Sequence, residues 1–367
     1  MRQKRTIWGR RSMLKLLGLA AVGATAGVVT GRVIDIADSG AGSDASSDGP
    51  ASRAAGGSPS AAAPAPAPPG PRVRPTIVDS GSPMTMRMTY GADPRQFGDL
   101  HLPPAMVEGV PAPTAPAAPA QTPAQTPAQT PAPNAARAVP LVVMIHGGGW
   151  MDSSTAAGAA HQAEDLADAG VAVWNIEYRG TGGAGGWPRT YEDVAAAIDV
   201  IPFLADASPV PLDLGRVAVT GVSAGGSLAA WAANREALPD GAPGARPIFP
   251  IRNCVAMCGV YDLARAIRWG DPYIRPLLGG TPEEHPDRYR NTSPIAYMAR
   301  NVRMVILHGR NDSVVDVQQA ISYEAASRRA RRPVAMRLFD DAAHSSWDDL
   351  AGPQWRAAKE AILHLVA

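Results

Sequence analysis

The feature that most constrains this chain is the pentapeptide Gly221-Val222-Ser223-Ala224-Gly225, which lies between a short apolar run, 216–220, and a helix-like run, 226–231. A Gly-x-Ser-x-Gly pattern at a strand-to-helix turn is typical of a nucleophilic serine, because glycines remove the Cβ atoms that would clash in so tight a turn. The helix that follows directs its free N–H groups and positive dipole end toward the turn. The pattern predicts that Ser223 is a nucleophile. A plain Gly/Ser turn before a helix is the alternative.

The periodicity of the apolar residues predicts the fold class. Two segments near residues 84–102 alternate apolar and polar residues, as half-buried strands do. Beyond residue 138 the apolar runs become continuous and helix-like stretches separate them, which indicates a mainly parallel sheet with helices on both faces. We therefore expect an α/β fold with about eight strands. The expected strands are 84–90, 97–102, 139–145, 171–176, 216–220, 254–257, 302–307 and 334–339, and the expected helices are 160–169, 191–204, 227–237 and 317–329.

The first 31 residues resemble an export signal. They carry six basic side chains and no acidic one, include the pair Arg10-Arg11, and continue into an uncharged, moderately apolar run, 16–30. Twin-arginine export signals have this composition. The alternative to a cleaved signal is a basic amphipathic leader or an uncleaved anchor. We expect a periplasmic or extracellular protein, exported by the twin-arginine route, whose membrane contact is confined to this segment.

The next segments predict the domain boundaries. Residues 32–75 consist mainly of Ala, Gly, Ser and Pro, with too few apolar side chains to offset the entropy of ordering them, so we expect a disordered linker. A folded domain is expected over 76–367. It is interrupted at 104–138 by a low-complexity insertion with three tandem Gln-Thr-Pro-Ala units. Such an insertion is tolerated in a surface connection because loop-closure entropy grows only logarithmically with length.

Charge and cysteine content exclude several classes of protein. The formal net charge is +1, and without the six basic residues of the leader it is −5, which argues against a nucleic-acid partner. The two cysteines, Cys254 and Cys258, are expected to be small core residues. In a strand they would lie about 13 Å apart, too far for a disulfide. A zinc site needs further ligands nearby, so we expect no metal and no organic cofactor.

A glycine-rich loop is the candidate for stabilising an oxyanion. His146-Gly147-Gly148-Gly149-Trp150 follows directly on the predicted strand 139–145. If this loop lies beside Ser223, the N–H groups of Gly148, Gly149 and Ala224 can converge on a developing negative charge. Trp150 is expected to line the substrate pocket. A flexible loop after a buried strand is the alternative.

Two further residues are expected to complete a catalytic triad. Asp312 follows the predicted strand 302–307, and His344 lies in the loop after the next one, so both fall at the carboxyl edge of the sheet. His344 would take the proton of Ser223, and Asp312 would fix the tautomer of His344. Asp316 is a rival acid, but it lies where the next helix begins and is expected to cap it. The other histidines fall in strands, helices, the glycine-rich loop or an irregular segment: His101, His146, His161, His285, His308 and His364.

In its elbow, its HGGGW loop, and the order of Ser223, Asp312 and His344, the chain resembles the α/β-hydrolase superfamily, and most of all its esterase/lipase and kynurenine-formamidase-like branch. The resemblance covers 84–367 apart from the insertion. It implies that Arg179 and Asp193 are structural partners. No extended helical cap precedes the HGGGW loop, so any lid must come from 268–298, which we expect to be irregular. The run 180–185 also satisfies a dinucleotide-binding pattern, but a glycine-rich loop explains it equally well.

These observations predict an exported serine hydrolase, foremost a carboxylic-ester hydrolase that acts on a small-molecule ester or amide through an acyl-enzyme. Three alternatives stay open. One is an amide-cleaving relative, such as an arylformamidase or an exopeptidase-like enzyme. The others are a cell-envelope acyltransferase and a non-catalytic binding protein on the same fold. The sequence does not predict the oligomeric state.

Overall fold

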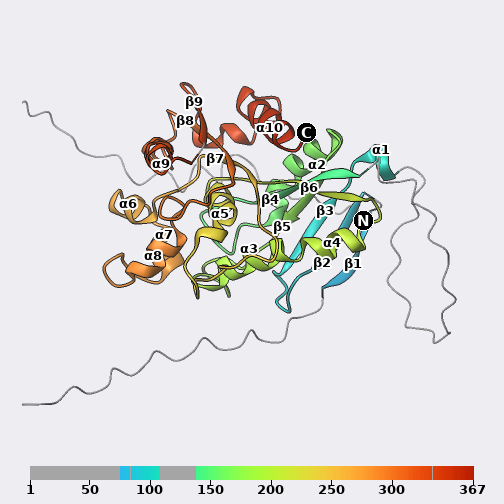
Figure 1. The fold of residues 1–367 in the computed structure, drawn as a ribbon, viewed down its shortest axis with the longest axis horizontal. Helices are drawn as coiled ribbons and strands as arrows, with labels where there is room; N and C mark the ends of the chain where they lie inside the picture. The colour runs from blue at the N-terminus through green and yellow to red at the C-terminus, as the bar shows by residue number, and fades with distance from the viewer. Residues whose placement is uncertain (1–74, 83, 108–137, 333) are drawn as a thin grey trace, which may run out of the picture. The chain divides into compact units, whose positions relative to one another are not determined.

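A nine-stranded sheet organises the residues that the computed structural model describes, which are 75–82, 84–107, 138–332 and 334–367. The strand order is β1-β2-β3-β5-β4-β6-β7-β8-β9 (Figure 1). The pairs β1/β2, β2/β3 and β3/β5 are antiparallel, and the other five pairs are parallel. The strands are β1 (Thr76–Ser82), β2 (Thr85–Thr89), β3 (Phe97–His101), β4 (Val139–Ile145), β5 (Ala172–Ile176), β6 (Leu212–Val222), β7 (Asn253–Met257), β8 (Arg303–Gly309) and β9 (Val334–Phe339).

Helices connect the strands and cover both faces of the sheet. They are α1 (Pro104–Val107), α2 (Ala160–Asp168), α3 (Arg189–Asp199), α4 (Ile201–Ala207), α5 (Ala224–Ala233), α6 (Leu263–Arg268), α7 (Ile274–Leu278), α8 (Pro286–Thr292), α9 (Gln318–Arg329) and α10 (Pro353–Leu365), with short 3₁₀ turns η2 (Ala156–Ala159), η3 (Arg235–Ala237) and η4 (His344–Trp347). The predicted fold class, a mostly parallel α/β sheet between helical layers, is confirmed.

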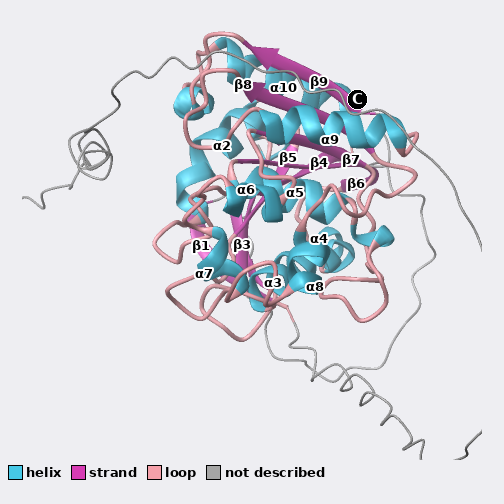
Figure 2. Cartoon of the chain, turned by 90° about the vertical axis from the view of Figure 1, so that its left-hand side faces the viewer, coloured by secondary structure: helices cyan, strands magenta, loops and turns pink. Residues whose placement is uncertain are grey.

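The alternation of side chains along β4 shows how the two layers form. Leu141, Val143 and Ile145 belong to one core cluster, and Val142 and Met144 belong to the other. The first cluster includes residues of α3, α5 and α9, and the second includes residues of α2 and α10 (Figures 1 and 2). Because successive side chains of a strand point to opposite faces, a continuous apolar run such as β4 requires burial on both sides.

The sequence did not predict β1. Its segment contains only two large apolar residues, Ile77 and Val78, and it continues from the linker composition without a clear boundary. Pairing with β2 provides the hydrogen bonds of this edge strand. Its structure therefore depends on its neighbour more than on its own hydrophobic pattern.

The segment between β7 and β8 differs from the prediction. The stretch 268–298 was expected to be irregular, but it contains α7 and α8. Pro286 lies in the first turn of α8, where a missing N–H costs no helical hydrogen bond. In Figure 1, α6, α7 and α8 lie next to one another on the left of the view, whereas β1 lies on the right.

Three sequence predictions fall on residues that the structure does not describe. The signal segment 1–31, the linker 32–75 apart from Pro75, and residues 108–137 of the insertion 104–138 lie outside the described ranges. The four-residue helix α1 occupies the start of that insertion. Within the described part of the chain, every helix is too short or too polar to span a bilayer.

Candidate active site

Ser223 occupies the turn between β6 and α5 in a strained conformation. Its φ of 58° and ψ of −121° lie in a region that non-glycine residues rarely adopt, and α5 begins at the next residue. The flanking glycines allow this turn. A Cβ on Gly221 would lie 2.6 Å from the Ile145 carbonyl oxygen, and one on Gly225 would lie 2.7 Å from the His146 carbonyl oxygen. Strand-to-helix turns of this kind hold a nucleophilic serine exposed at the sheet edge.

The glycine-rich loop lies beside Ser223. A Cβ built on Gly147 would be 2.7 Å from the Val222 carbonyl oxygen and 3.5 Å from the Ser223 Cβ atom. Gly148 and Gly149 have φ values of 106° and 62°, which only glycine adopts readily. Among the described residues, neither of their N–H groups donates a hydrogen bond. Both are therefore available to a substrate oxygen.

Asp312 and His344 form a hydrogen-bonded pair. The Nδ1 atom of His344 lies 2.8 Å from the Asp312 Oδ2 atom, and the Val314 and Val315 N–H groups each donate to Oδ1 at 2.9 Å. Burial acts to raise the pKa of the Asp312 carboxyl, but the hydrogen bonds from His344, Val315 and Val314 together hold it below its usual value. An ionised Asp312 is thus ready to orient the imidazole.

The loops after β8 and β9 pack directly on each other. A Cβ on Gly309, at the end of β8, would clash with Ala342 in the loop after β9. The Asn311 N–H donates to the Ala342 carbonyl at 3.2 Å. This packing explains why residues 32 positions apart in sequence, Asp312 and His344, meet.

Cys258 lies next to this pair, because its Sγ atom and the ligand atoms of Asp312 and His344 lie within 4.8 Å of one another. Burial raises the pKa of the Cys258 thiol, and a hydrogen bond from the Ser223 N–H opposes that rise. No hydrogen bond joins Ser223 Oγ to His344 within the described residues. Such contacts often form only when substrate binds. The prediction that both cysteines are buried and unbridged is confirmed.

The same three residues are a poor metal site. Cys258, Asp312 and His344 are the one group of potential ligands found among the described residues. Burial raises the pKa of the Cys258 thiol well above its ordinary value, which opposes the thiolate that a metal requires. The Asp312 carboxylate and the His344 Nδ1 atom already bond each other.

The rival residues have other partners. Asp316 accepts a hydrogen bond from the Gln318 N–H at 2.8 Å, at the start of α9, but Val317 occupies the N-cap position that was expected for Asp316. His308 is fully buried near the end of β8, and its Nε2 atom lies 2.9 Å from the Val315 carbonyl oxygen. Burial lowers the pKa of His308. Its Nε2 atom also lies 3.5 Å from Asp312 Oδ2.

A buried network behind the loop was not predicted. Glu177 and His146 are each 2% exposed, and the Glu177 Oε1 atom lies 3.0 Å from the His146 Nε2 atom. Arg95 also pairs with Oε1, at 3.1 Å. Burial acts to raise the pKa of the Glu177 carboxyl, but bonds from His146, Ala156 and Tyr178 lower it overall. One sequence signal was available: Glu177 is an acidic residue directly after a buried strand, at the edge where the site lies.

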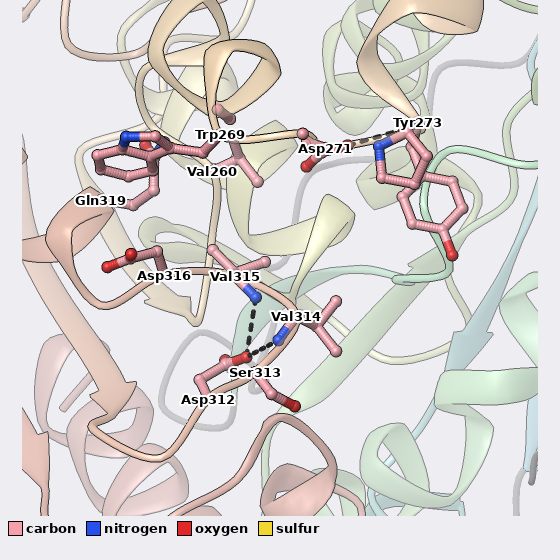
Figure 3. Close-up of a pocket in the computed structure, with 13 residues that line it drawn as sticks. Val260, Trp269, Asp271, Tyr273, Asp312, Ser313, Val314, Val315, Asp316 and Gln319 are labelled. Atoms are coloured by element: carbon pink, nitrogen blue, oxygen red, sulfur yellow. Dashed lines mark hydrogen bonds between the residues drawn. The ribbon is translucent and has the colours of Figure 1, made fainter. Parts of the chain in front are cut away.

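A cavity of about 540 Å³ opens beside Asp312. Figure 3 shows Trp269, Asp271 and Tyr273 on one side of it and the segment 312–316 on the other. The Tyr273 ring packs against Gly149, because a Cβ on that glycine would lie 2.8 Å from a ring carbon. The cavity is thus lined by Asp312 and by a tyrosine that contacts the glycine-rich loop, and its volume is that of a small-molecule pocket.

Trp150 does not line this cavity. Its side chain is 1% exposed and belongs to the core. Its assignment to the substrate pocket stays a prediction. Arg179 and Asp193 do pair as expected, through two bonds of 2.7 and 2.6 Å. In the run 180–185, a Cβ on Gly180 would come within 2.7 Å of the Asp152 Cα atom, so packing against 151–152 explains that glycine.

Comparisons with known proteins give a consistent result. The BD-FAE family model matches residues 129–326. Esterase LipC of Mycobacterium tuberculosis is 28% identical over 289 residues, which are 75% of this chain and 63% of the relative. The probable carboxylic ester hydrolase LipM of the same organism is 31% identical over 231 residues, which are 61% of this chain and 52% of the relative. The chain thus spans less than two thirds of the length of either relative.

Solved structures share the fold. A truncated carbohydrate esterase from gut microbiota superposes with a TM-score of 0.58 at 20% identity, over 80% of this chain and 97% of that one. The propionate-bound esterase Est2 of Thermogutta terrifontis superposes with a TM-score of 0.55 at 21% identity, over 76% and 92%. At 20% and 21% identity, these similarities are evidence for a shared fold alone.

Proposed function

Because this chain belongs to the BD-FAE family, whose model matches more than half of it, and has the α/β-hydrolase fold, we propose that it is a carboxylic-ester hydrolase that uses Ser223, His344 and Asp312. The observation that carries the proposal is the hydrogen bond of 2.8 Å between Asp312 and His344, at the sheet edge where Ser223 is held in a strained turn. The esterase names of its sequence relatives support the same reaction class.

The reaction follows from these groups. Ser223 Oγ bonds to the acyl carbon while its proton passes to His344 Nε2, and the carbonyl electron pair moves onto oxygen. The N–H groups of Gly148, Gly149 and Ala224 stabilise that oxyanion. Collapse breaks the bond to the alcohol, which leaves with the proton from His344. Water then gives its proton to His344 and attacks the acyl-enzyme, and the acid leaves as Ser223 recovers its proton.

The first test is hydrolysis of p-nitrophenyl esters of increasing acyl length by the wild-type chain and by Ser223→Ala. We expect ester turnover in the wild type and its loss in the variant. A fluorophosphonate should label the wild type alone. Equal turnover in both would refute the role of Ser223. Preference for N-formylkynurenine would favour the amide-cleaving alternative, and product that appears only with an added alcohol acceptor would favour acyl transfer.

We also propose that the basic leader directs export through the twin-arginine route, on the basis of Arg10-Arg11 and the uncharged run that follows. The test is fractionation of cells that express the full chain or its Arg10→Lys/Arg11→Lys variant. Export of the first and retention of the second are expected. Equal export of both would exclude the twin-arginine route.

A further inference from the structure

The two glycine N–H groups of the oxyanion loop are each tied to a neighbouring carbonyl. A peptide unit is planar and trans, so the Gly147 carbonyl and the Gly148 N–H share one rigid plane and point in opposite directions. The Gly148 carbonyl and the Gly149 N–H share the next plane. A bond that holds either carbonyl therefore sets the direction of the N–H on the other side of its plane.

The first carbonyl is held by His146. The Nδ1 atom of His146 lies 2.9 Å from the Gly147 oxygen, while its Nε2 atom lies 3.0 Å from Glu177 Oε1. Both ring nitrogens thus face oxygen atoms, so the ring bridges the Glu177 carboxylate and the Gly147 carbonyl.

Other contacts fix the ring itself. The Tyr178 ring stacks on it with centroids 4.2 Å apart and planes 7° apart, and the Tyr178 hydroxyl donates to the His146 carbonyl at 3.1 Å. Glu177 is anchored in turn by the N–H groups of Ala156 at 3.0 Å and Tyr178 at 2.9 Å. The carboxylate and the imidazole can hardly move without breaking several bonds.

The second carbonyl is held by Ser154. Its hydroxyl donates to the Gly148 oxygen at 3.2 Å, and the Met151 N–H donates to the same oxygen at 3.1 Å. The segment that carries Ser154 is held in place by Arg95, which donates to the Ser154 carbonyl at 2.8 Å. Arg95 also pairs with Glu177, so the two supports are connected.

We propose that Glu177, acting through His146, and Ser154 are positioning residues that aim the Gly148 and Gly149 N–H groups at the oxyanion. Their hydrogen bonds go to the loop carbonyls or to each other. Their effect is to keep the two donors directed at a charge that exists only in the transition state, where a fixed dipole is most useful. This inference rests on the proposed ester hydrolysis.

The test is steady-state hydrolysis of p-nitrophenyl acetate by a set of Ser154 variants, with the affinity of a boronic acid that forms a tetrahedral adduct on serine as the second readout. Ser154→Val removes the hydroxyl. Threonine has almost the same shape as valine but keeps a hydroxyl, so Ser154→Thr is the matched variant. We expect kcat to fall about fivefold in Ser154→Val with KM unchanged, and to stay near wild type in Ser154→Thr. Boronate affinity should fall in parallel with kcat.

Ser153→Ala is the matched control, because Ser153 is exposed and adjacent to Ser154. It should match the wild type in every readout. For the other support, Glu177→Gln should lower kcat and boronate affinity by roughly ten- to a hundredfold, and the exposed Glu192→Gln should lower neither. Melting temperatures identify any loss that comes from unfolding.

These outcomes distinguish failure of the proposed ester hydrolysis from failure of the positioning role. If Ser223→Ala keeps its turnover, the proposed function fails. If Ser223→Ala is inactive but Ser154→Val and Ser154→Thr share the wild-type kcat and boronate affinity, positioning by Ser154 is wrong. A change in KM alone, without a change in kcat, would likewise contradict positioning of the oxyanion donors.

Discussion

The glycine-rich loop with its elbow and the cavity beside Asp312 lie at the same edge of the sheet but are built differently. In the first region, backbone N–H groups are the proposed oxyanion donors, and buried side chains such as Glu177 and His146 bond the loop or each other. In the second, side chains line an open space, and two large apolar ones among them are well exposed: Trp269 at 44% and Val314 at 51%. The first region is constrained by close backbone packing, whereas the second is free to vary with the substrate.

The largest expected effect tests the link between the two regions. Asp312 orients His344 from the cavity side, so Asp312→Asn should lower kcat by about 10⁴-fold, because the amide can stabilise the wrong imidazole tautomer. The measurement is kcat for p-nitrophenyl acetate. Asp316→Asn is the control and should stay within about twofold of wild type, since Asp316 bonds the start of α9. A larger loss in Asp316→Asn than in Asp312→Asn would reverse the assignment of the acid.

The next effect tests whether the first region depends on backbone packing. Gly225→Ala would place a Cβ 2.7 Å from the His146 carbonyl oxygen, so it should destabilise the fold by about 3 kcal/mol and lower activity as the elbow shifts. Gly158→Ala meets nothing within 4 Å and should leave stability nearly unchanged. The measurement is the midpoint of urea unfolding of both variants, which should be lower for Gly225→Ala than for Gly158→Ala. Equal midpoints would show that the elbow accommodates a methyl group.

This difference explains what could be predicted from the sequence. Ser223 and the glycines around it were identifiable because a strained turn against a neighbouring backbone tolerates few residue types, and that restriction is visible in one chain. Asp312 and His344 followed from their places after successive strands. Their contact depends on the packing of Gly309 on Ala342, which no local pattern reveals.

Other features depend on contacts between distant segments. Glu177 could have been an ordinary polar residue at a strand end, and its contacts with Arg95 and His146 are visible only in the folded structure. The burial of Trp150 in the core likewise depends on the elements packed around it, and its part in the substrate pocket stays a prediction. The edge strand β1 and the helices within 268–298 were missed because short elements depend on their neighbours more than on their own periodicity.

A smaller effect concerns acid stability. The pKa of Asp312 is lower in the folded state than in the unfolded chain, so its ionised form stabilises the fold. That contribution is complete above the unfolded pKa of about 3.9 and is lost as the pH falls through the lower, folded pKa. The stability gap between wild type and Asp312→Asn, measured by urea unfolding from pH 7 to pH 3, should therefore narrow below about pH 4. A constant gap would mean that the carboxylate charge contributes nothing to folding.

The smallest effect tests the second region. Trp269 presents a large apolar surface to the cavity and is held on its other side by the Arg265 guanidinium, 4.4 Å from the ring centroid. A substrate group that enters the cavity would bury part of this ring. At about 25 cal/mol per Å², half-covering it stabilises the bound ester by about 1 kcal/mol, or roughly fivefold in kcat/KM.

Trp269→Ala should therefore lower kcat/KM about fivefold for esters whose long chain enters the cavity and leave esters with short chains on both sides unchanged. Two substrate series are needed, one that varies the acyl chain of p-nitrophenyl esters and one that varies the alcohol of acetate esters. The series that loses its length dependence identifies the part of the ester that lies in the cavity. Ile248→Ala is the control, because Ile248 is 57% exposed and does not line the cavity. If both series keep their length dependence in Trp269→Ala, the cavity does not bind the ester. The substrate would then be selected by the same backbone region that performs the chemistry.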